Sequence, residues 1–165
     1  MRLKNLVIIS LLFIALIGSL ATISAVDFVS TSSGTSMSQT TLTIDDIQFN
    51  IPQGYVSAES DSDTSDADDA KDVDGTKVDA QLTSVYKSGA GDKIKITVGS
   101  LANDKKIESI SNTSGNKTKI ANKEGFLFKD VDDGKDICRF EYLQDGKIVK
   151  IEAFNEDIIS QVIGM

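Results

Sequence analysis

The chain contains no histidine and no tryptophan, and it has one proline and one cysteine among its 165 residues. Without histidine it cannot form a Ser-His-Asp triad or a Cys-His pair, and it has no imidazole to bind a metal. A zinc site would need carboxylates and a single thiolate, which is not a usual zinc ligand set. A hydrolase would therefore depend on a serine–lysine or carboxylate pair, and it would need a deep cleft that holds an acid with a raised pKa. The one cysteine, Cys138, cannot form an internal disulfide, and we expect it to be a small buried apolar residue.

Positive charge is also in short supply, since 17 Lys and Arg oppose 25 Asp and Glu for a net charge of −8. The imbalance is local: residues 59–79 carry nine acids against Lys71 and Lys77, whereas the rest of the chain is nearly neutral. Binding of nucleic acid requires a basic stripe for the phosphates, and the sequence has none. We therefore expect no nucleic-acid partner.

The N-terminus differs from everything that follows it. Arg2 and Lys4 precede an uncharged apolar run at 6–26, which is the pattern of an export signal. The small-x-small triplet SLA near the end of the run suits cleavage, but the run is also long enough to span a bilayer as a helix. We expect residues 1–26 to be a signal peptide or, if uncleaved, an N-terminal membrane anchor.

The remainder divides into a short stalk and one domain. Residues 27–41 are rich in Ser and Thr and have few apolar side chains to bury, which is typical of a flexible stalk. Residues 42–165 are enough for a single domain. Together with the N-terminal segment, this organisation predicts an exported protein, extracellular or at the cell surface.

Alternating apolar residues predict that the domain consists mainly of strands. In TLTIDDIQFNI, a two-residue turn at the paired aspartates places Ile44 opposite Ile47 and Leu42 opposite Phe49. The strongest pattern is DICRFEYLQDGKIVKIEAF, in which Asp-Gly supplies the positive φ of a type I′ turn. Its register makes one face apolar and gives the other face two cross-strand pairs of opposite charge, Glu141 with Lys150 and Arg139 with Glu152.

Two helices are predicted beside the strands. NDKKIESIS indicates a short helix at 105–111. In NEDIISQVIG, Asn155 can cap a second helix, acids occupy its first turn, and Gly164 can end it. The expected fold is α+β: an antiparallel β-meander of about seven short strands with the C-terminal helix packed on one face, preceded by the N-terminal signal or anchor helix.

Several short stretches resemble small exported proteins of unknown function that are common in methanogenic archaea. The resemblance rests on FNIPQGY, GDKIKITV, KEGF, DGKIVKIEA and NEDIISQVI. It extends over most of residues 42–163, and it implies export and an antiparallel domain. It implies no catalytic residues, and the acidic insert is particular to this chain.

The acidic stretch is the most distinctive feature of the sequence, and two interpretations stand beside each other. The first is a disordered, solvated insert at 57–80, the usual state of clustered aspartates between strands. The second is a calcium site, because DVDGTKVD places Asp72, Asp74 and Asp79 as oxygen ligands around a glycine turn. These three aspartates are the weak metal-ligand candidates of the chain.

Asn112 and Asn116 each begin an N-glycosylation sequon, and both lie in one predicted surface loop. In an exported protein, two sequons in one loop predict glycosylation, and an unmodified polar loop is the alternative of equal weight.

These observations predict a non-enzymatic cell-surface or secreted domain that interacts with an envelope component or another protein. Membrane contact would run through residues 6–26 if that segment is not cleaved. No cofactor is expected. The alternative is a calcium-dependent extracellular module that uses the Asp-rich insert.

Overall fold

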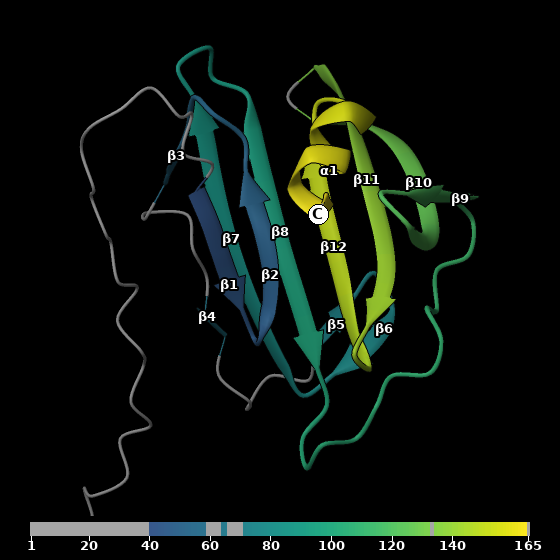
Figure 1. Ribbon diagram of the computed structural model, residues 1–165. Helices are drawn as coiled ribbons and strands as arrows, with labels where there is room; N and C mark the ends of the chain where they lie inside the picture. Colours follow the sequence, from purple (N-terminus) through teal and green to yellow (C-terminus); the bar gives the residue numbers. More distant parts are fainter. Residues whose placement is uncertain (1–39, 59–63, 66–70, 133, 165) are drawn as a thin grey trace, which may run out of the picture. The chain divides into compact units, whose positions relative to one another are not determined.

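The computed structural model describes residues 40–58, 64–65, 71–132 and 134–164 (Figure 1). The predicted signal or anchor at 1–26 and the stalk up to residue 39 lie outside the described residues. The last two residues assigned to the stalk, Thr40 and Thr41, belong to the first strand. Among the described residues, no helix is both long and apolar enough to cross a membrane.

The first element is the hairpin of β1 (Thr40–Ile44) and β2 (Ile47–Ile51). Its register pairs Ile44 with Ile47 and Leu42 with Phe49, as the sequence predicts. The turn residues Asp45 and Asp46 both have positive φ, at 46° and 65°, which is the geometry of a type I′ turn.

The main sheet is antiparallel, and seven of its strands follow the order β3-β7-β8-β12-β11-β10-β9, with β4 also paired to β7. The predicted antiparallel sheet with a C-terminal helix is confirmed. The strand order differs from a simple meander, however, because β8 pairs with β12 rather than with β9. The strands are β3 (Tyr55–Ser57), β4 (Thr64–Ser65), β7 (Ala80–Ser88), β8 (Lys93–Ser100), β9 (Asn116–Ile120), β10 (Lys123–Asp132), β11 (Lys135–Gln144) and β12 (Lys147–Ala153).

The β11–β12 hairpin has the register that its sequence specifies. Asp145 and Gly146 form the turn at φ 54° and 78°, and Phe140 pairs with Ile151. The apolar face is buried, since Phe140 and Ile151 are both 0% exposed. Cys138 is buried on the same face, as expected.

The C-terminal helix α1 (Glu156–Ile163) and the β1–β2 hairpin cover this apolar face of the sheet (Figure 1). The Asn155 side chain accepts a hydrogen bond from the Ile158 amide at 2.9 Å, which confirms the predicted N-cap. Ile159 and Val162 are fully buried against β2 and β12. This layer, formed by the hairpin, the helix and the sheet, contains the main hydrophobic core.

A second hairpin, β5 (Lys71–Val73) and β6 (Thr76–Val78), lies on the opposite face of the sheet at one end (Figure 1). Val73 and Val78 pack on Ile148 in a separate small core. Gly99 makes this contact feasible, because a Cβ there would lie 2.7 Å from a methyl group of Val78.

The structure corrects two sequence predictions, one in this hairpin and one at 105–111. The expected disordered insert at 57–80 is wrong for residues 71–80, because Val73 and Val78 flank an Asp-Gly turn and are buried; residues 59–63 and 66–70 lie outside the described residues. The predicted helix at 105–111 is also wrong. That segment forms no helix, and its buried Ile107 donates a backbone hydrogen bond to the Gly146 carbonyl at 2.8 Å, which fixes it beside the β11–β12 turn.

Candidate functional site

The face of the sheet opposite α1 carries the charged side chains of β11 and β12. Their Cα register is the predicted one, with Glu141 opposite Lys150 and Arg139 opposite Glu152. The ion pairs, however, run along the strands. Arg139 Nε lies 3.2 Å from Glu141 Oε1, and Lys150 Nζ lies 3.5 Å from Glu152 Oε1. The predicted charges therefore share one face, but they pair differently from the cross-strand expectation.

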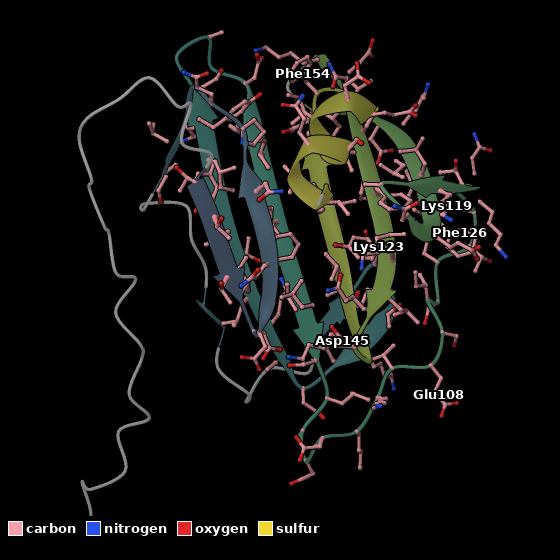
Figure 2. All side chains as sticks on the ribbon, in the orientation of Figure 1. Glu108, Lys119, Lys123, Phe126, Asp145 and Phe154 are labelled. Atoms are coloured by element: carbon pink, nitrogen blue, oxygen red, sulfur yellow. The ribbon has the colours of Figure 1, made fainter. Side chains whose placement is uncertain are left out.

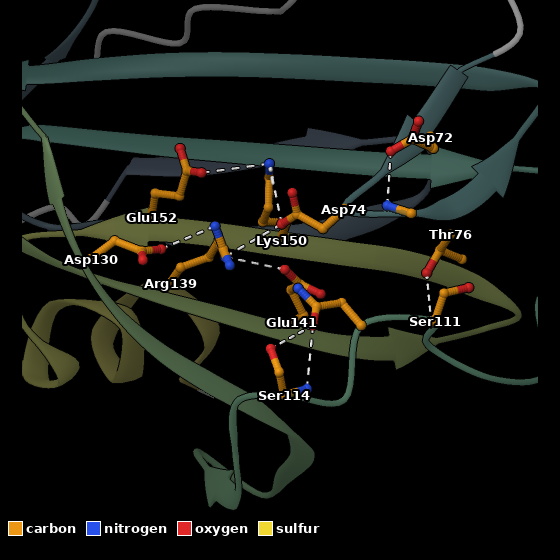
Figure 3. A network of polar contacts seen from close by, with 12 residues as sticks. Asp72, Asp74, Thr76, Ser111, Ser114, Asp130, Arg139, Glu141, Lys150 and Glu152 are labelled. Carbon is orange, nitrogen blue, oxygen red and sulfur yellow. Dashed lines mark hydrogen bonds and ion pairs between the residues drawn. The ribbon is translucent and has the colours of Figure 1, made fainter.

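A carboxylate from the β5–β6 turn explains this arrangement (Figure 3). Asp74 Oδ2 lies 3.3 Å from Arg139 Nε and 3.6 Å from Lys150 Nζ, so it stands between the two cations. Arg139 also pairs with Asp130 at 3.0 Å, and its guanidinium lies 4.3 Å from the centre of the Phe128 ring. We call Asp74, Asp130, Arg139, Glu141, Lys150 and Glu152 the charged cluster.

Glu141 is the unusual member of the charged cluster. It is 0% exposed, and burial, followed by the nearby Asp74 carboxylate, raises its pKa from 4.5 to about 8. Burial alone would raise the pKa of Asp74 as well, but the adjacent Glu141 carboxyl group and the charges of Lys150 and Arg139 hold it below its ordinary value. The pKa values of the two carboxyl groups thus move in opposite directions, upward for Glu141 and downward for Asp74.

The charged cluster is partly buried around the fully buried Glu141, and it is incompletely hydrogen-bonded. Asp74 Oδ2, Arg139 Nε and both carboxyl oxygens of Glu141 make no hydrogen bond of good geometry within the described part of the chain. Buried ion clusters of this kind carry a desolvation cost that their attraction only partly offsets. The core packing of the opposite face does not require them.

Beside the charged cluster, the same face of the sheet is hollowed by a cavity of about 580 Å³. Side chains from five adjacent strands line this cavity, so the face of the sheet is concave here. The strands are β7, β8, β12, β11 and β10. The lining residues are Gln81, Thr83, Val85, Lys93, Lys95, Val131, Asp132, Ile137, Glu152 and Ala153.

A smaller cavity of about 140 Å³ adjoins it and shares Lys93, Asp132 and Ile137. It lies at the end of the sheet where the β7–β8 and β10–β11 turns approach each other. Lys135 Nζ lies 3.6 Å from Asp92 Oδ1 and joins the two turns. Phe154, which is 40% exposed, lies at this end of the sheet (Figure 2).

The main cavity has the composition of a binding site for a polar ligand. Its volume lies in the range of about 300–1,000 Å³ that small-molecule sites occupy. Within the described residues, neither Lys93 nor Lys95 has an ion-pair partner, whereas Glu152 is held by Lys150. The acid with the raised pKa, Glu141, does not line this cavity and has no exposed surface. The deep cleft with an accessible perturbed acid, which a hydrolase would need, is not found among the described residues.

The three calcium candidates do not converge. Asp72 Oδ1 accepts the Gly75 amide at 2.8 Å, Asp79 Oδ2 accepts the Ala102 amide at 2.8 Å, and Asp74 belongs to the charged cluster. Each carboxylate thus has a structural contact of its own. The described ranges contain no group of three or more Asp, Glu, His or Cys arranged to hold a metal ion.

The two sequon asparagines have different environments. Asn112 is half-buried, and its Oδ1 accepts hydrogen bonds from the amide and the hydroxyl of Ser114, at 3.2 and 2.8 Å. Asn116 is exposed at the start of the edge strand β9. Glycosylation stays a prediction, and Asn116 is the more accessible of the two acceptors.

Comparison with known proteins gives no guide to this site. No protein-family model, curated protein or solved structure matches the chain. The cavity residues were missed by the sequence analysis. The signal available was strand alternation, because the exposed Lys93 and Lys95 alternate with the buried Ile94 and Ile96.

Proposed function

We propose that the chain is an exported, non-enzymatic domain at the cell surface, released or held by its N-terminal segment, which binds an envelope component through the open face of its sheet. The observation that carries this proposal is the cavity on that face. It is wide, polar, and lined by side chains of interior strands. The opposite face is already occupied by α1 and the β1–β2 hairpin.

Export is supported by the charge-flanked apolar run at 6–26 and by the Ser/Thr-rich segment behind it. The resemblance of the strand and turn motifs to exported archaeal proteins favours the same location. A non-enzymatic role is supported by the lack of histidine and by the inaccessibility of Glu141. Binding is therefore the activity that these residues suit best.

The experiment is co-sedimentation of the tagged full chain with cell envelopes isolated from the source cells. We expect Gln81→Trp, which places a large side chain in the cavity, to lose most of the binding. The matched control is Gln48→Trp, which introduces the same side chain at an exposed position of β2 on the covered side of the sheet. Equal binding by the two variants, both folded, would refute a role for the open face.

A further inference from the structure

We propose that the cavity on the open face binds an acidic saccharide, with the anionic group of the sugar held by Lys93 and Lys95. This inference rests on the proposed function and names the chemistry of the envelope component. Three features of the cavity carry it: two ammonium groups without an ion-pair partner in the described part of the chain, the polar and apolar groups around them, and the interior strands β8, β12 and β11 that form its middle.

The two lysines present their positive charges on one face of β8. They lie two residues apart on β8, so their side chains leave the same face of the sheet. Neither has an ion-pair partner within the described residues. Glu152 lies opposite Lys95 in the strand register, but its carboxylate is held by Lys150 in the charged cluster. The charged cluster thus holds the acid that lies opposite Lys95 in the strand register.

The rest of the cavity suits a ligand that carries several hydroxyl groups on a carbon ring. Gln81 offers an amide and Asp132 a carboxylate, and both can bond hydroxyl groups. Val85, Val131 and Ile137 provide apolar surface for the carbon–hydrogen face of a ring. The Thr83 hydroxyl is bonded to Thr97 at 3.1 Å, which fixes the floor of the cavity rather than leaving it to rearrange.

An acidic peptide suits the cavity less well. Peptides commonly bind by adding a strand to an open sheet edge. The strands β8, β12 and β11, which form the middle of this cavity, are interior and have a paired neighbour on both sides. On β10 the pairing with β9 ends at Leu127, before the lining residues Val131 and Asp132. Recognition in the middle of the cavity therefore comes from side chains, which favours a ligand rich in hydroxyl and carboxylate groups.

The test compares two double variants of the full chain that differ only in which lysine pair is removed. Lys93→Gln/Lys95→Gln removes the proposed anion site. Lys117→Gln/Lys119→Gln removes a pair of exposed lysines with the same two-residue spacing on β9, the edge strand (Figure 2), and changes the net charge equally. Calorimetric titration with a galacturonic acid trimer, a neutral galactose trimer, a triglutamate peptide and inorganic phosphate supplies the readout, and melting temperatures confirm folding.

We expect the wild type and the Lys117→Gln/Lys119→Gln variant (the β9 variant) to bind the acidic trimer, and the neutral trimer to bind to them at least about tenfold more weakly. We expect the Lys93→Gln/Lys95→Gln variant (the β8 variant) to lose at least about tenfold in affinity for the acidic trimer. The inference is overturned if the acidic trimer does not bind or if both double variants bind it equally. Equal or tighter binding of triglutamate or phosphate also overturns it, since the site would then recognise charge without the sugar. Loss of envelope binding in Gln81→Trp, with no loss in the β8 variant, would leave the proposed function intact and remove only this inference.

Discussion

Replacement of Glu141 by glutamine tests the state of the charged cluster directly. Glu141 has no exposed surface, and its pKa is raised from 4.5 to about 8. Between these two pH values the folded chain retains a proton that the unfolded chain releases. The stability of the wild type must therefore fall as the pH rises through this window. Glutamine mimics the protonated carboxyl group in shape and in its ability to donate a hydrogen bond, but it cannot ionise.

The magnitude follows from the difference between the two pKa values. Each pKa unit corresponds to about 1.4 kcal/mol, so the rise of the Glu141 pKa to about 8 corresponds to a stability loss of about 5 kcal/mol between pH 4.5 and pH 8. At pH 7 about 3 kcal/mol of this has already been lost. The pKa of Asp74 is lowered, so its contribution is complete above its unfolded value and does not change in this range. A domain with about 5–15 kcal/mol of total stability would show the effect clearly.

Urea unfolding followed by circular dichroism at pH 5, 6, 7 and 8 measures the effect. We expect Glu141→Gln to unfold at a similar urea concentration to the wild type at pH 5 and to be more stable by several kcal/mol at pH 8. Glu124→Gln, an exposed position on β10, is the matched control and should follow the wild type at every pH. A glutamine variant that is less stable than the wild type at pH 8 would refute the reasoning. It would show that Glu141 is ionised there and held by Arg139, 3.2 Å away.

Three further predictions concern the β5–β6 hairpin and its aspartates. Asp74→Asn keeps a residue that tolerates the positive φ of the turn, but it removes the charge between Arg139 and Lys150. We therefore expect the free energy of unfolding, measured with urea, to fall by about 1–3 kcal/mol. The control Asp145→Asn, at the same turn position of β11–β12, should change it by less than about 0.5 kcal/mol. Gly99→Ala forces a methyl group against Val78 and should lower the free energy of unfolding by about 1–3 kcal/mol. Gly89→Ala, with open space around it, is the control and should lower the melting temperature little. Equal effects of the two substitutions on the melting temperature would contradict the packing argument. Calorimetric titration of the full chain with calcium should give no saturable heat at millimolar metal, because the three candidate aspartates have separate partners; saturable heat that is lost when they are changed to asparagine would restore the calcium interpretation.

The hairpins show what local sequence can determine. In β11–β12, Asp145-Gly146 fixes the turn and the alternation fixes which face is buried, so the register followed from nineteen contiguous residues. The same information was present in β5–β6, where Asp74-Gly75 lies between two apolar valines. There the high density of aspartates favoured a solvated loop, and only the second core around Ile148 shows why the hairpin forms.

Non-local pairing limited the rest of the prediction. No local pattern could indicate that β8 pairs with β12, because the two strands are separated by three others in the sequence. The cavity depends on this same arrangement. Alternation places Lys95 and Glu152 on one face, but only the strand order puts them opposite each other. Only the curvature of the sheet brings Asp132 of β10 to the same cavity as Gln81 of β7.

The charged cluster and the cavity are best understood together. Replacing a buried ion cluster by apolar side chains is often neutral or stabilising, so stability alone is a weak reason for this one to exist. Here the Asp74 carboxylate fixes Lys150, and Lys150 in turn holds Glu152 at the cavity wall. With Glu152 held in that position, Lys93 and Lys95 remain without an acidic partner within the described chain. On the proposed function, the desolvation cost of the cluster would be offset by the binding of an external anion to these two ammonium groups, in addition to the contacts that Asp74 makes within the fold.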